Sequence, residues 1–141
     1  MFEFLDHTAD VAVRLCSMGE ADLLKDAAQA LLAILLAPDS GPVEVKVSIP
    51  LLLEAEDAEA LLVDFLNELI FLFDTKRFLV GQVEVEEIRL DRPSRLRVVL
   101  QGETHDPLRH SVKTEVKAAT FHGMRIVRTC RGVEADVVFD L

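Results

Sequence analysis

Acidic side chains stand near both ends of this sequence, and their types suit a hard divalent cation. Asp10 opens an apolar segment close to the N-terminus, and Asp140 is the penultimate residue, beside the main-chain carboxylate of Leu141. Carboxylate and carbonyl oxygens are the ligands that Ca²⁺ and Mg²⁺ prefer, whereas Zn²⁺ prefers sulfur and nitrogen. If the first and last strands meet, as chain ends often do, Asp10 completes a cation site with Asp140 and Leu141. The alternative is a solvated polar strand end, which is the commoner role for such residues.

Three further polar residues, Asp6, His7 and Thr8, precede Asp10. His7 has the chemistry of a metal ligand or of a general base. The alternative is a hydrogen-bonded turn residue, because no cysteine or serine stands nearby to form a nucleophile pair with it. We therefore predict that Asp6, His7 and Thr8 shape a turn that holds Asp10 in place.

Lys117 is the remaining candidate for a functional side chain. It lies in an alternating segment, 112–121, where it shares its side of the predicted strand with Lys113, Glu115 and Ala119. One interpretation is an exposed lysine, and the functional one is a lysine set against the carboxylate site. The sequence contains no Walker A loop, no G-x-G-x-x-G and no G-x-S-x-G motif, so it offers no recognisable catalytic machinery.

Helices and strands must alternate to position these residues. Helical spacing predicts a first helix that begins with a capping box or a turn at 17–20 and stops at Pro38. A second helix is predicted over 54–77, with Asp57 as its N-cap. Strands are predicted over 11–16, 43–49, 80–90 with a bulge near 86–87, 94–103, 112–121, 124–129 and 132–141. Short turns between the later strands favour an α+β fold, in which two helices pack on one face of a mostly antiparallel or mixed sheet.

The composition predicts one globular domain spanning residues 1–141. Half of the residues are hydrophobic and 28% are charged, which is typical of a chain with a buried core. The apolar runs are far too short to cross a bilayer, so we expect no membrane association. Glu3 and Asp6 fall where an export signal would need basic or apolar residues, and we therefore expect a cytoplasmic protein.

The formal net charge of −10 restricts the partners of this protein. A protein that neutralises phosphates with its own basic side chains should be basic, and this chain also lacks Trp and Tyr for base stacking. We therefore expect no autonomous nucleic-acid binding, and basic proteins or divalent cations as partners. Cys16 and Cys130 are too few for a disulfide framework or a zinc site, and we expect both to be reduced.

Five segments of the sequence, taken together, resemble one protein family. They are DHTAD (6–10), LLVDFLNELIFLFD (61–74), GETHDPLRH (102–110), VKAATFH (116–122) and FDL (139–141). Each would be weak evidence alone, but in this order they span essentially the whole chain and resemble the archease family.

The resemblance implies an accessory protein rather than an enzyme. Its expected partner is the RtcB-type RNA ligase, which joins 2′,3′-cyclic phosphate or 3′-phosphate ends to 5′-hydroxyl ends in tRNA splicing and RNA repair. The expected role is to promote guanylylation of the ligase and to allow multiple turnover. The family's metal site, seen with calcium, corresponds here to Asp10, Asp140 and Leu141, and its functionally important lysine corresponds to Lys117.

Two other functions fit the same residues. A metal-dependent phosphoester hydrolase or transferase could use the carboxylates to hold Mg²⁺ and activate water, although His7 is its only obvious general base. A general, chaperone-like protein would need a large exposed apolar patch, which the regular patterning of the predicted helices does not favour.

Overall fold

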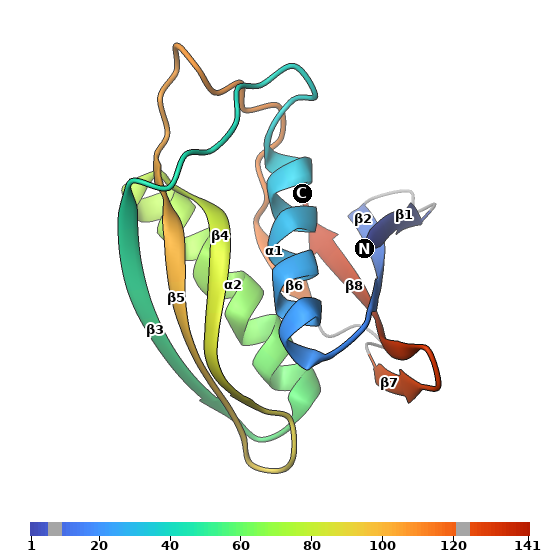
Figure 1. Cartoon of the computed structure of the whole chain (residues 1–141). Coiled ribbons are helices and arrows are strands. Elements are labelled where there is room, and N and C mark those ends of the chain that lie inside the picture. Colours follow the sequence, from blue (N-terminus) through green and yellow to red (C-terminus); the bar gives the residue numbers. More distant parts are fainter. Residues whose placement is uncertain (6–9, 121–124) are drawn as a thin grey trace.

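The computed structural model describes residues 1–5, 10–120 and 125–141. In this part of the chain, two helices interrupt a series of strands (Figure 1). The helices are α1 (Glu20–Leu35) and α2 (Ala58–Lys76). The strands are β1 (Phe2–Leu5), β2 (Asp10–Ser17), β3 (Val47–Ala55), β4 (Phe78–Arg89), β5 (Ser94–Thr104), β6 (Ala118–Thr120), β7 (Ile126–Thr129) and β8 (Gly132–Asp140).

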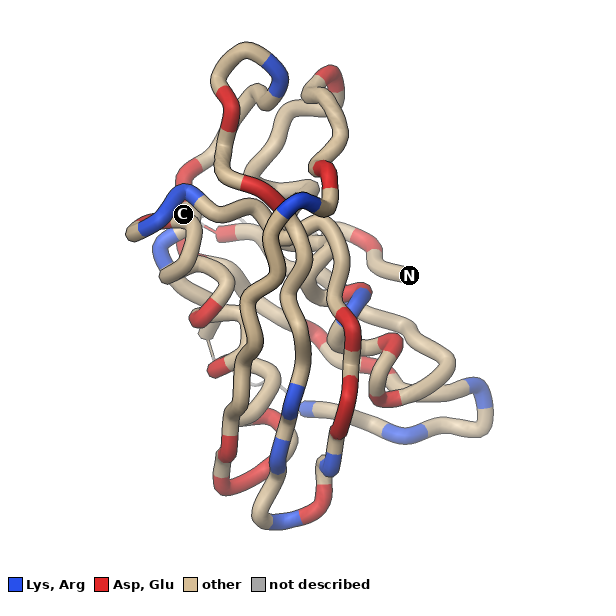
Figure 2. Tube along the Cα trace, turned by 60° about the vertical axis from the view of Figure 1, so that its left-hand side comes forward, with Lys and Arg blue, Asp and Glu red and all other residues tan. Residues whose placement is uncertain are grey.

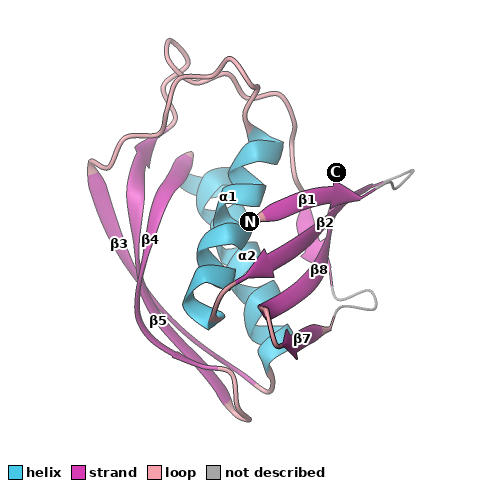
Figure 3. Cartoon of the chain, turned by 45° about the vertical axis from the view of Figure 1, so that its right-hand side comes forward, coloured by secondary structure: helices cyan, strands magenta, loops and turns pink. Residues whose placement is uncertain are grey.

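The strands form two antiparallel sheets. The larger sheet has the order β1-β2-β8-β6, with β7 also paired to β8, and the smaller has the order β3-β5-β4. Both helices lie between the two sheets (Figure 3). This arrangement confirms the predicted α+β class. It also refines the expected single pair of layers, because the helices are covered by a sheet on each side.

The core fills the space between the helices and the two sheets. The alternating apolar residues of β2 and β8 form a buried face, since Val13, Leu15, Val137 and Phe139 all belong to the core. Phe65 of α2 is also fully buried. Among the described residues, no helix is both long and apolar enough to cross a membrane.

The two helices begin differently. Asp57 caps α2 as predicted, because its Oδ1 accepts a hydrogen bond of 2.8 Å from the Ala60 amide. The predicted start of this helix at residue 54 is wrong, since Glu54 still belongs to β3. The predicted capping box of α1 does not form. Its N-cap is Gly19, and the Ser17 hydroxyl donates instead to Asp26 at 2.6 Å.

Two predicted strands have the wrong extent. The segment 43–49 enters the sheet only from Val47, and the strand continues to Ala55. The segment 112–121 forms a strand only over Ala118–Thr120. Its first part caps a helix instead, because the amides of Lys113 and Thr114 donate to the carbonyl of Leu35 at the end of α1.

The bulge predicted near 86–87 is confirmed. The register of β4 against β5 shifts between Val85 and Glu87. A second shift, which the sequence analysis did not predict, lies between Val80 and Gln82, opposite Gly102 and Gln101. Bulges bend and twist a strand, and here they fall in the longest strand of the smaller sheet.

Candidate functional site

The predicted meeting of the first and last strands is confirmed. β2 and β8 pair antiparallel along their whole length, and Asp10 lies directly opposite Asp140. Residues opposite each other share one face of the sheet, with Cβ atoms about 5 Å apart. Figures 1 and 3 accordingly show the C-terminus beside the larger sheet, next to the start of β2. We call Asp10, Asp140, Leu141 and Lys117 the acidic tip.

Lys117 belongs to the acidic tip through its backbone. Its amide donates a 2.8 Å hydrogen bond to the main-chain carbonyl of Asp140, and Ala118 pairs with Asp140 in the sheet. The side chain of Lys117 is exposed. The predicted polar side of this segment is wrong at Ala119, which is buried opposite Phe139.

The oxygen atoms of the acidic tip fit a hard cation. Two carboxylates directly opposite each other repel, and a divalent cation would remove that repulsion. In the described part of the chain, no group of three or more His, Cys, Asp and Glu residues is placed to hold a metal ion. The third anionic group of the predicted site is the C-terminal carboxylate of Leu141. The Asp140 carbonyl already accepts the Lys117 amide, so Asp140 would contribute its side chain. The metal site itself stays a prediction.

Asp6, His7 and Thr8 lie outside the described residues. Their role in shaping the turn before Asp10 therefore stays a prediction.

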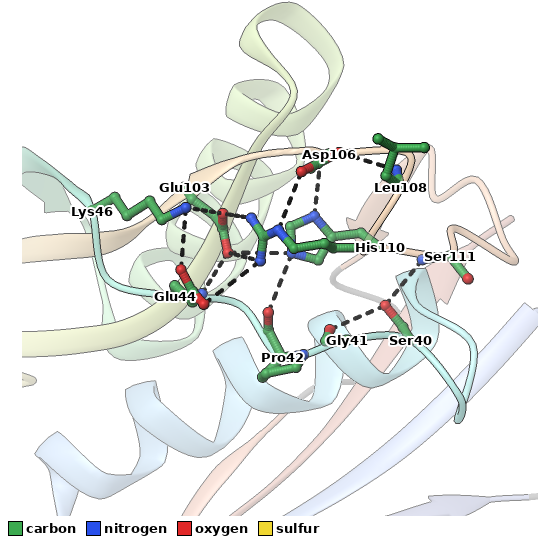
Figure 4. Close-up of polar contacts among 11 residues, drawn as sticks. Ser40, Gly41, Pro42, Glu44, Lys46, Glu103, Asp106, Leu108, His110 and Ser111 are labelled. Atoms are coloured by element: carbon green, nitrogen blue, oxygen red, sulfur yellow. Dashed lines mark hydrogen bonds and ion pairs between the residues drawn. The ribbon is translucent and has the colours of Figure 1, made fainter.

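A second polar cluster lies where β5 leaves the smaller sheet (Figure 4). We call it the Glu103 cluster, and its other members are Glu44, Lys46, Arg109 and His110. Glu103 is only 3% exposed, and its carboxylate accepts hydrogen bonds from both terminal nitrogens of Arg109. It also accepts one of 2.6 Å from the Glu44 amide, and Lys46 Nζ lies 3.5 Å away. Every side of this buried carboxylate therefore faces a donor.

The imidazole of His110 fixes the other side of the cluster. Its Nδ1 accepts a 2.9 Å hydrogen bond from the Asp106 amide, which assigns the ring proton of the neutral form to Nε2. Nε2 lies 3.3 Å from the Pro42 carbonyl and 3.3 Å from Glu103 Oε2, so it can donate to either oxygen. Arg109 Nε adds a 3.2 Å bond to the Asp106 carboxylate.

These contacts change the acidity of Glu103. The hydrogen bonds from Arg109, followed by the Glu44 amide and the Lys46 charge, lower the pKa of Glu103 to about 2 although burial opposes the change. A carboxylate with such a low pKa stays ionised at neutral pH and is a poor general base. The Glu103 cluster therefore has a structural role.

The structural role is to join two long loops. The Glu103 cluster ties residues 40–46 to residues 103–110, and the Gly41 amide adds a 2.8 Å bond to the Arg109 carbonyl. A Cβ atom at Gly41 would lie 2.7 Å from that carbonyl oxygen, so the close approach requires glycine. From the sequence, the segment 102–110 contributed only to the family resemblance. The available signal was the presence of five charged or histidine side chains within it.

The charges on the outer face of the smaller sheet pair among themselves. Arg95 contacts Glu54 at 2.9 Å and Glu87 at 3.7 Å, and Arg97 contacts Glu87 at 3.8 Å. Figure 2 shows these basic and acidic positions interleaved at one end of the three strands. Exposed pairs of this kind contribute little stability, and they leave no charge concentrated on this face.

Comparison with known proteins identifies the family. The model of the Archease protein family (MTH1598/TM1083) matches residues 2–141. The archease of Methanopyrus kandleri is 36% identical over 140 residues, covering 99% of each chain. The archease of Pyrococcus furiosus is 37% identical over 129 residues, covering 90% of this chain and 88% of its own.

Solved structures agree with this assignment. The solution structure of protein 1598 from Methanobacterium thermoautotrophicum superimposes with a TM-score of 0.79 at 31% identity, over 99% of this chain and 98% of its own. A crystal structure from Thermotoga maritima, described as "an archease, possible chaperone", shares the fold with a TM-score of 0.59 at 20% identity. The chain described here therefore belongs to the archease family.

Proposed function

We propose that this protein is a non-catalytic activator of an RtcB-type RNA ligase in tRNA splicing and RNA repair. It promotes guanylylation of the ligase and allows multiple turnover. The acidic tip is the part that acts on the ligase, and it holds a divalent cation, Ca²⁺ or alternatively Mg²⁺. The observation that carries the proposal is the register of β2 against β8, which sets Asp10 opposite Asp140 at the chain end.

The chemistry of the acidic tip supports an accessory role. It contains carboxylates and an exposed lysine, and its described residues include no serine or cysteine that could act as a nucleophile. The chain carries a net charge of −10, which suits a basic protein partner better than RNA. Membership of the archease family is consistent with a protein that acts through a partner.

Each residue of the acidic tip has a separate role in the proposal. Asp10, Asp140 and the C-terminal carboxylate of Leu141 bind the cation, which supplies positive charge that organises oxygen ligands between the two proteins. The backbone bond from Lys117 to Asp140 fixes the chain end against β6. The Lys117 side chain extends into solvent, where it can reach an anionic group of the ligase or its nucleotide.

Multiple-turnover ligation by the cognate ligase tests the proposal. Wild-type protein should raise the number of joined ends per ligase well above one, and Asp10→Ala and Asp140→Ala should lose most of this stimulation. Glu134→Ala is a matched control, because Glu134 lies on the same face of β8 but away from the chain end. Full stimulation by folded Asp10→Ala and Asp140→Ala proteins would refute the role of the tip.

A phosphoester hydrolysis assay separates the proposal from the hydrolase alternative. The purified protein alone, incubated with phosphoesters and Mg²⁺, should release no product, whereas an enzyme that uses the same carboxylates should turn over. His7, the general base that the hydrolase alternative requires, lies outside the described residues.

A further inference from the structure

The segment 61–74, one of the five that carry the family resemblance, forms most of α2 and lies outside the acidic tip. Most of its residues are apolar and buried in the core. Asn67 is an exception, because it is a half-buried polar residue in the middle of the helix. Asparagine is one of the poorer helix formers, since its side chain competes for backbone hydrogen bonds. A contact outside the helix accounts for its presence.

Asn67 binds the backbone of β6 through both ends of its side-chain amide. Its Oδ1 accepts a 2.8 Å hydrogen bond from the Ala119 amide, and its Nδ2 donates one of 3.2 Å to the Ala119 carbonyl. A backbone N–H can bond only to an acceptor, so the two contacts together fix which end of the side-chain amide is the oxygen. A residue of a neighbouring strand would make the same pair of bonds, and α2 therefore takes the place of a further strand at this edge.

The strand β6 needs such an anchor because it is short and stands at the edge of the larger sheet. It has three residues, and β8 is its neighbour in the sheet. Successive residues of an antiparallel strand point their backbone groups to alternate sides, and those of Ala119 point away from β8 toward α2. Ala119 is only 4% exposed. Without Asn67, its buried N–H and C=O groups would lose their partners, which is costly.

The bonds of Asn67 also bear on the acidic tip. Lys117 lies two residues before Ala119, about 7 Å along the chain, and its amide donates to the Asp140 carbonyl. On the other side of Lys117, Val116 is buried in the core. Apolar burial is not directional, so it does not fix the orientation of the backbone at Lys117. The pair of hydrogen bonds from Asn67 does, because it holds both polar groups of one peptide segment.

We propose that Asn67 is a positioning residue, which holds β6 against α2 and thereby fixes the backbone of Lys117 and the place of the Asp140 chain end. Its neighbours Leu66 and Leu69 are buried in the core, so the helix provides a fixed point for this contact. The inference rests on the proposed function and deepens it, because it names a residue outside the acidic tip that keeps the tip arranged for the ligase. Asn67 itself touches neither the ligase nor the cation.

Native-state hydrogen exchange, followed by NMR, tests the arrangement of the tip without the ligase. Asn67→Leu has a side chain of similar size with no donor or acceptor, and it should speed exchange of the Lys117 amide about 10-fold. Asn67→Asp keeps the acceptor for the Ala119 amide but loses the donor, so its effect should be smaller. Asp57→Ala is the matched control, because it removes the N-cap of α2 without touching β6. It should leave exchange at Lys117 within about 2-fold of wild type.

Multiple-turnover ligation by the cognate ligase, with a saturating amount of each variant, tests the consequence for function. Asn67→Leu should lose most of the stimulation, whereas Asp57→Ala should keep it. Urea denaturation of both variants confirms that they are folded and measures how much stability each has lost. A residue that serves only the stability of α2 would give the same result as the N-cap variant.

The outcomes separate the positioning role from the proposed function. Equal stimulation by wild type and Asn67→Leu overturns the positioning role and leaves the proposed function intact. Equal loss by Asp57→Ala and Asn67→Leu also overturns it, because the effect then comes from the stability of the helix. Unchanged exchange at Lys117 in Asn67→Leu overturns it whatever the ligation assay gives. Absence of stimulation by wild-type protein refutes the proposed function, and the positioning role with it.

Discussion

The acidic tip and the Glu103 cluster both bring carboxylates together with basic groups, but the groups that surround the carboxylates differ between the two sites. In the Glu103 cluster, a buried carboxylate meets Arg109, Lys46, a backbone amide and an imidazole. In the acidic tip, two half-buried carboxylates face each other across a strand pair. The cluster satisfies its buried carboxylate within the chain, whereas the tip, in the proposed function, holds a cation supplied from outside.

This difference assigns a structural role to the Glu103 cluster and agrees with the proposed role of the acidic tip. A buried charge is tolerated only when its partners replace the water it has lost, so the Glu103 cluster must keep its partners for the fold to survive. Like charges placed opposite each other weaken a sheet, so Asp10 and Asp140 are not expected to stabilise the fold by facing each other. Neutralising a single carboxylate should therefore lower the free energy of unfolding much more in the Glu103 cluster than in the acidic tip.

Glu103→Gln should give the largest effect. The substitution removes the negative charge beside Arg109 and Lys46 and turns an amide nitrogen toward other donors. We expect the free energy of unfolding to fall by about 2 kcal/mol, measured by urea denaturation at neutral pH. Glu54→Gln is the matched control, because Glu54 pairs with Arg95 at the surface and should change stability by less than about 0.5 kcal/mol. Equal effects of the two substitutions would show that burial does not distinguish these pairs.

The pH dependence of the same variant sharpens the comparison. The pKa of Glu103 falls from its ordinary value of 4.5 to about 2 in the folded protein. A lowered folded-state pKa means that the stabilisation is complete above about pH 4.5 and is lost as the pH falls toward 2. Thermal unfolding of wild type and Glu103→Gln should therefore differ most near neutrality and converge below pH 4.5. A constant difference across this range would contradict the role given to the ionised carboxylate.

Gly41→Ala attacks the Glu103 cluster from the backbone. The new Cβ would lie 2.7 Å from the Arg109 carbonyl oxygen, so one of the two loops has to move. We expect a loss of about 1 kcal/mol in urea denaturation, which is the lower end of the cost of overpacking. Asp39→Ala, at an exposed neighbouring position, should leave stability unchanged. A neutral Gly41→Ala would show that the two loops are not fixed to each other.

Asp140→Asn should give the smallest effect on stability and the largest on metal binding. Without added metal, relief of the repulsion with Asp10 should keep the unfolding free energy within about 0.5 kcal/mol of wild type. Addition of Ca²⁺ should raise the Tm of wild type but not of Asp140→Asn. Calorimetric titration with Ca²⁺ provides the direct measurement. Equal Tm shifts for both proteins would remove Asp140 from the proposed site.

The sequence predicted the elements that depend on local patterns. Strand patterns predicted the segments that form β2 and β8, Asp57 was recognised as an N-cap, and the bulge near 86–87 was predicted. The wrong boundaries had long-range causes. The segment 43–49 alternates as a strand does, but its first residues bond to the end of β5 instead of extending β3.

The Glu103 cluster could not be predicted for the same reason. Its members come from two segments, 40–46 and 103–110, which are adjacent because β3 and β5 pair. No local sequence pattern predicts that pairing. The acidic tip was accessible to prediction because chain ends often meet in space. The backbone hydrogen bond from the Lys117 amide to the Asp140 carbonyl depends on the short strand β6, and only the structure shows it.

The pairing of β2 with β8 has a consequence for the order of folding. The smaller sheet joins strands from the middle of the chain, from Val47 to Thr104, whereas β2 and β8 stand at opposite ends of the chain. Closing such a long loop costs more entropy and is slower than forming local contacts. We expect the larger sheet to close last, so that Asp10 and Asp140 come together only in molecules that have finished folding. Under the proposed function, an incompletely folded chain would be unable to engage the ligase, because the acidic tip belongs to the last sheet to form.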